Sequence, residues 1–273
     1  MPKIQLEDVE INYYLDDFRD PWSEKKPPVV LLHHGFARNA KFWTGWVPTL
    51  ARKCRVLRYD ARGCGESTFP TEDYPLTMER LAADALGVMD KMGIDKVHWV
   101  GMLSGGLVGQ MFAVLYPERI KSLTLVYSPC TVGGLGSVLG AGQGDTTTAI
   151  EKLGIREWRT RTVSASMDLS KADPKLVEWT INEMAKTPKR VALALTRSYE
   201  RSDMTGRLAE IKAPTLIMVG DRSRIVSPDM QRTMRERIQN SRFRVFPNIA
   251  DGIDLIMPER CAEEALAFIT EVD

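Results

Sequence analysis

The stretch Val97-His98-Trp99-Val100-Gly101-Met102-Leu103-Ser104-Gly105-Gly106 decides how this chain is interpreted. Its first residues predict a buried strand, the flanking glycines predict a sharp turn, and the residues from Gly105 to Tyr116 predict a buried helix that ends before Pro117. The tip of the turn is Leu103, whose side chain has no proton to lose and no lone pair with which to attack. A strand joined to a helix in this way is the building unit of a parallel sheet.

The same alternation of apolar runs and amphipathic stretches extends along most of the chain. Residues 76–92 and 259–269 have helical spacing, with Gly93 as a stop for the first. Further strands are expected at residues 11–15 (paired with residues near Ile4), 29–33, 55–59, 123–127, 214–219 and 243–246. This order predicts an α/β fold with a mostly parallel, doubly wound sheet covered by helices on both faces.

The strand rhythm stops between Ser128 and about Leu208. A glycine-rich run at 133–144 is followed by helical stretches at 147–157, 174–185 and 190–199. We therefore expect residues 1–128 and 209–273 to form the core, and residues 129–208 to form a helical cap inserted after the sixth strand. Such a cap would lie over the carboxyl edge of the sheet, where ligands of open α/β sheets bind.

Composition narrows the class of protein. The 273 residues carry 37 lysines and arginines against 36 acidic residues, so no nucleic-acid partner and no membrane surface is expected. No signal peptide and no membrane span is predicted from the apolar runs. The cysteines are scattered without metal-type spacing, which favours a reduced, cytoplasmic protein without a metal: Cys54, Cys64, Cys130 and Cys261. A monomer or homodimer that binds a small molecule beneath the cap is expected.

Four motifs in order resemble a known family. His34-Gly35-Phe36 after a strand is similar to an oxyanion loop, and residues 60–67 (Asp-Ala-Arg-Gly-Cys-Gly-Glu-Ser) resemble the D-x-R-G-x-G-x-S turn of the same family. Residues 214–220 and 247–258 resemble the segments that carry its acid and its histidine. The chain thus resembles the α/β-hydrolases, in the group of enol-lactonases, meta-cleavage-product hydrolases and non-haem haloperoxidases. The turn 101–105 then matches the nucleophile elbow G-x-S-x-G.

The departures from this pattern fall on the functional positions. By the resemblance, the serine, acid and histidine positions hold Leu103, Ser223 and Asp251. All three histidines of the chain lie far from the position of the base: His33, His34 and His98. Loss of the serine or histidine of such a triad costs about 10⁶ in turnover, which leaves roughly 10³ to 10⁴ over water. Efficient triad hydrolysis is therefore not expected.

Ser104 is the alternative nucleophile if the motif is displaced by one residue. The glycines at 101, 105 and 106 already match the expected frame, and neighbouring side chains at a helix start diverge by roughly 100°. We therefore expect Ser104 to be a capping or surface residue. A hydrolase with a displaced catalytic residue remains an open alternative.

Parts of the site are expected to survive. The resemblance implies that the backbone N–H groups of Phe36 and Ser104 form an oxyanion hole, which does not depend on a nucleophile. A carboxylate at Asp251, facing Leu103 and an apolar cap, would be partly desolvated, so its pKa would rise and it could act as a general acid or base. Ser223 could hydrogen-bond and orient it. The alternative is that Asp251 only caps a turn.

Other candidates concern the ligand. His34, Arg38, Trp43, Tyr127 and Cys130 are expected near strand ends or the cap entrance, where they could bind substrate. Asp251 and Asp254 without neighbouring histidines do not predict a metal site. The glycines at 133–144 lack the strand–turn–helix setting of a dinucleotide loop, so no cofactor is expected.

Two functions of different classes follow. The first is a cofactor-free, non-hydrolytic enzyme of the lyase, decarboxylase, isomerase or cyclase type, acting on a small carbonyl compound. The second is a non-catalytic ligand binder or interaction protein on a hydrolase scaffold. An apolar cap fits both.

Overall fold

A single sheet of eight strands organises the computed structural model, which describes residues 2–22, 26–71 and 74–273. The strand order is β1-β2-β4-β3-β5-β6-β7-β8; the pairs β1–β2 and β2–β4 are antiparallel, and every pair from β4–β3 to β7–β8 is parallel. The strands are β1 (Lys3–Gln5), β2 (Glu10–Asp16), β3 (Val29–His33), β4 (Arg55–Tyr59), β5 (Val97–Met102), β6 (Ile120–Val126), β7 (Thr215–Gly220) and β8 (Ser241–Phe246). The predicted fold class is confirmed.

Burial along the strands follows their place in the sheet. Every residue of β5 and β7 is buried, as expected for central parallel strands covered on both faces. The edge strand β8 has exposed residues at Arg242, Arg244 and Val245. The expected pairing of residues 11–15 with the region of Ile4 is confirmed, since Ile4 lies opposite Ile11.

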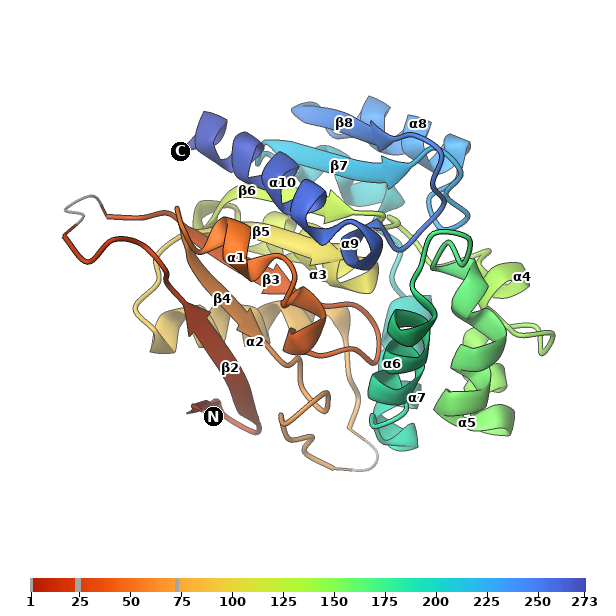
Figure 1. Cartoon of the computed structure of the whole chain (residues 1–273). Helices are drawn as coiled ribbons and strands as arrows, with labels where there is room; N and C mark the ends of the chain where they lie inside the picture. The colour runs from red at the N-terminus through yellow and green to blue at the C-terminus, as the bar shows by residue number, and fades with distance from the viewer. Residues whose placement is uncertain (1, 23–25, 72–73) are drawn as a thin grey trace.

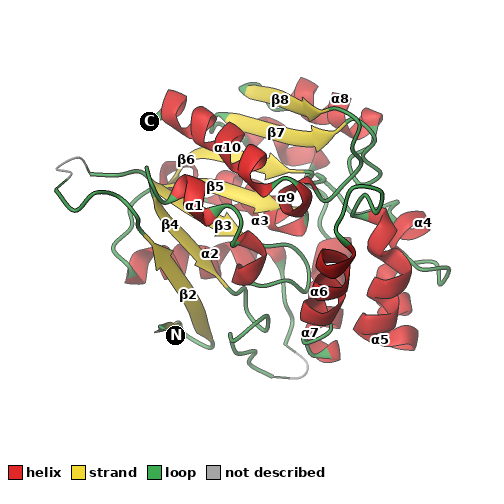
Figure 2. Cartoon of the chain, in the orientation of Figure 1, coloured by secondary structure: helices red, strands yellow, loops and turns green. Residues whose placement is uncertain are grey.

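Helices cover both faces of this sheet (Figures 1 and 2). One face carries α1 (Val47–Leu50), α9 (Ile253–Ile256) and α10 (Pro258–Val272), and the other carries α2 (Met78–Lys91), α3 (Ser104–Leu115) and α8 (Pro228–Arg237). Short 3-10 turns join these elements at Ala40–Trp43, Pro117–Arg119, Val163–Ala165 and Thr205–Glu210. No helix within the described residues is long and apolar enough to cross a membrane.

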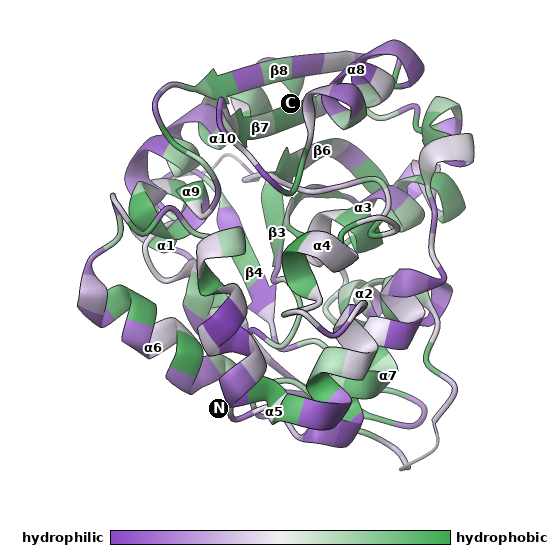
Figure 3. Cartoon of the chain, turned by 90° about the vertical axis from the view of Figure 1, so that its right-hand side faces the viewer, coloured by the Kyte–Doolittle hydropathy of each residue, from purple (hydrophilic) through white to green (hydrophobic). Residues whose placement is uncertain are grey.

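Between β6 and β7 the chain forms α4 (Gly136–Leu139), α5 (Thr146–Thr162), α6 (Pro174–Met184) and α7 (Lys189–Glu200). The arrowheads of the parallel strands point toward these helices in Figure 1, and Figure 3 looks onto the same end of the molecule. Helices α5 and α6 carry both hydrophilic and hydrophobic segments there, so each can bury one face against the sheet edge. The domain boundary at 129–208 stays a prediction.

Helix α5 is longer than the expected 147–157. It starts at the Asp145 cap, where the side chain accepts a hydrogen bond from the Thr148 N–H at 2.7 Å. It kinks at Gly154 (φ 73°), then continues to Thr162. The extra turn matters because it brings Trp158 and Arg159 to the cavity described below.

Candidate functional site

The turn between β5 and α3 is tightly constrained. Leu103 at its tip has φ 50° and ψ −125°, a strained conformation for a residue with a side chain. A Cβ atom at Gly101 would lie 2.5 Å from the Gly105 carbonyl oxygen, and one at Gly105 would lie 2.3 Å from the His33 carbonyl oxygen. The Ser128 hydroxyl donates to the Leu103 carbonyl and anchors the turn from β6. The strand, turn and helix predicted from the sequence thus form a rigid elbow.

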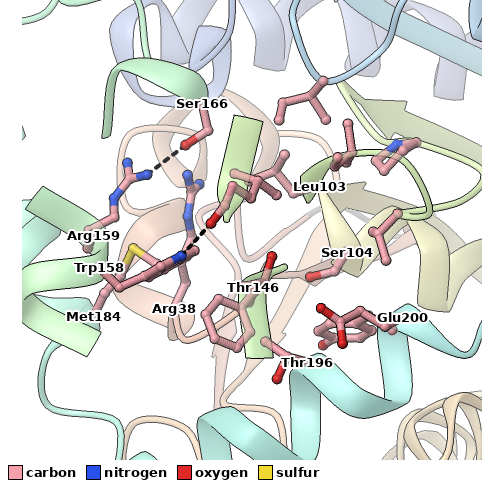
Figure 4. Close-up of a pocket in the computed structure, with 17 residues that line it drawn as sticks. Arg38, Leu103, Ser104, Thr146, Trp158, Arg159, Ser166, Met184, Thr196 and Glu200 are labelled. Carbon is pink, nitrogen blue, oxygen red and sulfur yellow. Dashed lines mark hydrogen bonds between the residues drawn. The ribbon is translucent and has the colours of Figure 1, made fainter. Parts of the chain in front are cut away.

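A cavity lies between this elbow and the helices α4–α7. It holds about 690 Å³ of empty space, including space open to solvent. Its walls are mostly apolar, and Figure 4 shows the side chains that face it. The apolar lining includes Phe36, Leu103, Leu135, Trp158, Met184 and Ile225.

Two backbone amides beside the elbow are free to bind an oxyanion. Phe36 and Ser104 both line the cavity, and among the described residues neither N–H has a hydrogen-bond acceptor. Ser104 is the first residue of α3, so its N–H belongs to the unpaired set at a helix N-terminus, where the helix dipole favours negative charge. The role of the two residues as oxyanion donors stays a prediction.

The side chain of Ser104 was expected at the surface or in a capping role, and that expectation is wrong. Ser104 is 6% exposed and lines the cavity, and Leu103 holds the N-cap position. The physical reason is that α3 is buried over most of its length, so its first turn faces the cavity rather than solvent. Its hydroxyl lies beside the phenol of Tyr199.

Arg38 lines the cavity as expected, but its charge is already matched. Its guanidinium donates to the Asp254 carboxylate at 2.8 Å, and both side chains are almost completely buried. The Tyr127 phenol belongs to the same cluster, and burial raises its pKa well above the usual value. Arg38 is therefore half of a buried ion pair whose other half lies behind the cavity wall.

Arg159 contributes a second guanidinium to the same cavity. It is 2% exposed and donates from Nη1 to the Ser166 hydroxyl at 2.7 Å. Its Nε and Nη2 groups have no acceptor within the part of the chain that the structure describes. Burial, and the positive charge of Arg38, lower the pKa of Arg159 to about 9. Arg159 is thus a buried cation without a carboxylate partner.

Asp251 is buried, but it does not line the cavity. Its carboxylate accepts hydrogen bonds from the Ser223 hydroxyl at 2.5 Å and from the Arg224 N–H at 2.7 Å. Burial raises the pKa of Asp251 to about 6, so the expected direction of the shift and the expected contact with Ser223 are confirmed. The next residue of this loop, Ile225, lines the cavity. Contrary to expectation, the carboxylate therefore turns toward the 223–225 loop rather than toward Leu103.

His34 also lies outside the cavity lining, contrary to its expected role in substrate binding. Its Nε2 accepts from the Ala61 N–H at 2.9 Å, while its Nδ1 lies 2.8 Å from the Gly35 carbonyl oxygen. Burial lowers the pKa of His34 to about 4, which keeps the ring neutral. Both ring nitrogens serve to hold the oxyanion loop in place.

Three further residues that were expected to contact the ligand are instead packed into the core. Trp43 is fully buried against Trp46, with ring centroids 5.0 Å apart. Cys130 points toward the Thr205 hydroxyl at 3.6 Å, and Tyr127 belongs to the buried cluster of Arg38 and Asp254. Each of the three is within a few residues, along the chain, of a residue that lines the cavity, but its side chain is buried in the core.

Several lining residues were not predicted from the sequence, Arg159 above all. A signal was available: Arg159 lies among Ile155, Trp158 and Thr162, which are buried positions after or next to the Gly154 kink of α5. Glu200 at the end of α7 was missed as well. It is the one carboxylate that lines the cavity among the described residues, and it accepts a hydrogen bond from the Thr147 hydroxyl at 2.8 Å.

The described residues contain no group of three or more His, Cys, Asp or Glu side chains that could hold a metal ion. The chemistry available in the cavity is therefore that of two backbone amides, two guanidinium groups, a few hydroxyls and the Glu200 carboxylate. Figure 4 places Arg38, Arg159 and Ser166 on one side and Ser104, Thr196 and Glu200 on the other. The site can bind negative charge at both the amides and Arg159.

Comparisons with known proteins agree with this geometry. The family model described as alpha/beta hydrolase fold matches residues 28–250. The chain is 26% identical to 3-oxoadipate enol-lactonase 1 of Acinetobacter baylyi over 80% of each chain. It is 24% identical to a putative carbamate hydrolase RutD of Azorhizobium caulinodans, covering 89% of this chain and 92% of that one. The solved enol-lactonase of Burkholderia xenovorans superposes with a TM-score of 0.87 at 21% identity, covering 98% of this chain and all of the other.

Proposed function

The chain belongs to the α/β-hydrolase fold family, and from that premise we propose that it acts on a small carbonyl compound without forming an acyl-enzyme. The observation that carries the proposal is Leu103 at the strained tip of the elbow, beside two unpaired amides. In the proposed assignment, Leu103, Ser223 and Asp251 occupy the three triad positions. A leucine cannot attack a carbonyl carbon, and the carboxylate of Asp251 is bonded to the 223–225 loop.

The amides of Phe36 and Ser104 support a reaction through an enolate. Backbone donors aimed at a developing oxyanion stabilise the transition state by several kcal/mol, about 3 for a single donor in measured cases. In such a step a base removes the proton next to the carbonyl, and the electron pair moves to the oxygen. Isomerisation and cyclisation of a small carbonyl compound begin in this way.

Glu200 is the side chain that we propose as the base. It lines the cavity, whereas Asp251 does not, and the carboxylate of Asp251 is bonded to the Ser223 hydroxyl and the Arg224 N–H. The hydrogen bond from the Thr147 hydroxyl orients one carboxylate oxygen of Glu200. This assignment replaces Asp251, which we propose positions the 223–225 loop.

Hydrogen exchange into a simple ketone tests the reaction. The probe is 4-oxopentanoate in deuterated buffer, followed by loss of its proton NMR signals next to the ketone. We expect exchange above the buffer rate, lost in Glu200→Gln because the base is removed, and retained in Asp251→Asn. Equal exchange in Glu200→Gln and the native chain would overturn the role of Glu200.

Hydrolysis is tested separately with a fluorophosphonate probe and a p-nitrophenyl ester. We expect neither stoichiometric labelling nor ester turnover, because no activated hydroxyl is available. Labelling that disappears in Ser104→Ala would show that Ser104 is a displaced nucleophile, and the hydrolases among the relatives make this the important control.

A second candidate is a binder that leaves its ligand unchanged. It is favoured by one observation: both the Glu200 and Asp251 carboxylates already accept hydrogen bonds from the protein. A ligand that binds in the cavity but shows no exchange and no chemical change would support this function over the enzyme.

A further inference from the structure

The guanidinium of Arg159 is a buried charged group of the cavity that has no carboxylate partner among the described residues. It lies on the second half of α5, is 2% exposed and faces the cavity (Figure 4). Taking a guanidinium out of water costs free energy unless its N–H groups find acceptors. Arg159 has a single partner, the Ser166 hydroxyl, at Nη1. A cation in this state points to an acceptor that the protein itself does not provide.

The free N–H groups of Arg159 share one edge of the guanidinium. Nε and Nη2 point in the same direction, so together they present a two-pronged donor that matches the two oxygens of a carboxylate. This chain already uses that edge elsewhere: Nε and Nη2 of Arg62 each donate to an oxygen of Asp84 at 2.6 Å. The same edge of Arg159 has no acceptor among the described residues.

The neighbouring charges do not neutralise Arg159. Arg38 is paired with Asp254, so that ion pair is neutral as a whole: its cation lowers the pKa of Arg159, and its carboxylate raises it by a smaller amount. Glu200 is the only carboxylate lining the cavity within the described residues, and Figure 4 places it on the other side. One end of an otherwise apolar cavity is therefore positive.

We propose that Arg159 binds the carboxylate of the ligand side-on, through Nε and Nη2, while Ser166 holds the guanidinium in place. The inference rests on the proposed function for the carbonyl end of that ligand and extends it. The substrate class is then a small, mostly apolar carboxylic acid that carries a carbonyl group. Its carboxylate lies at Arg159 and its carbonyl oxygen at the amides of Phe36 and Ser104.

Binding of butanoate and butanamide tests this, because the two probes differ in charge but hardly in shape. Titrations are followed by NMR of the arginine Nε–H signals and by calorimetry. We expect butanoate to bind about tenfold tighter than butanamide or better, with a shift of the Arg159 Nε–H signal. Arg159→Met should remove this preference and leave butanamide unchanged. Arg161→Met is the matched control on the same helix, where the exposed arginine pairs with Glu157.

Three results would overturn the proposal: no shift of the Arg159 signal up to the solubility limit of butanoate, equal affinity for the two probes, or a preference that survives in Arg159→Met. These outcomes are independent of the deuterium-exchange assay. Selective butanoate binding without exchange into 4-oxopentanoate would keep the carboxylate site and refute the enzyme. Exchange into 4-oxopentanoate without a preference for butanoate would keep the proposed enzyme and refute the carboxylate site.

Discussion

Two buried arginines of this chain, Arg62 and Arg159, are held in opposite ways. Arg62 is fully buried beside β4 and donates to two carboxylates, those of Asp84 and Asp8, at 2.6 to 3.1 Å. These partners raise the pKa of Arg62, whereas burial without a carboxylate lowers the pKa of Arg159 to about 9. The two side chains are about equally inaccessible to solvent, yet their pKa values shift in opposite directions.

The difference separates a structural charge from a functional one. Around Arg62 the chain provides carboxylate acceptors, so the ion pairs belong to the fold and join the loop after β4 to α2 and to the loop between β1 and β2. Around Arg159 the chain provides one hydroxyl and no carboxylate contact among the described residues, and in our proposal the ligand supplies the missing acceptor. A buried charge without a partner is therefore the better candidate for a functional role.

The largest expected effect on stability comes from removing Arg62, the arginine that is paired with carboxylates. Arg62→Met leaves the Asp84 carboxylate buried without its main partner, which should lower the free energy of unfolding by about 3 to 5 kcal/mol. Urea unfolding followed by circular dichroism measures it. The control is Arg197→Met, which breaks an exposed pair with Glu151 and should cost less than about 1 kcal/mol. Similar losses in both variants would contradict the structural role of Arg62.

The next effect concerns Asp251, a buried carboxylate held by a hydroxyl and backbone N–H groups instead of a cation. Its pKa is about 6 in the folded chain against 3.8 when unfolded, so the folded state binds the proton more tightly. Its contribution to stability is therefore present below about pH 4 and is lost as the pH rises through 6. The total is about 3 kcal/mol.

Asp251→Asn should remove the loss of stability that accompanies the rise in pH, because an amide can replace the protonated carboxyl between Ser223 and Arg224. The variant should be at least as stable as the native chain at pH 7, while the difference vanishes near pH 4. Urea unfolding across this range checks the prediction. A variant that is less stable at pH 7 would show that the ionised carboxylate is the favoured form.

The elbow shows what the sequence could predict. Gly101 and Gly105 mark positions where any Cβ would collide with backbone, so strand, turn and helix follow from local sterics. The assignment of the Phe36 and Ser104 amides as oxyanion donors comes from the family resemblance and not from these local sterics.

The side-chain directions could not be predicted in this way. Whether Asp251 faces Leu103 or the 223–225 loop depends on which N–H groups the loop leaves unpaired, and that is a tertiary property. Arg159 was not a candidate because the helix expected at 147–157 ended before it, whereas α5 continues to Thr162. Charge balance inside a cavity is visible only once the residues are assembled.

The free energy of unfolding of Arg159→Met without ligand tests directly whether the fold leaves Arg159 without a carboxylate partner. If the guanidinium is a buried cation without a carboxylate partner, methionine should leave the free energy of unfolding within about 1 kcal/mol of the native value or raise it. Saturating butanoate at about 100 times its Kd should then stabilise the native chain by about 2.7 kcal/mol and leave the variant unchanged. A loss of about 3 kcal/mol or more in the unliganded variant, like that expected for Arg62→Met, would contradict the account.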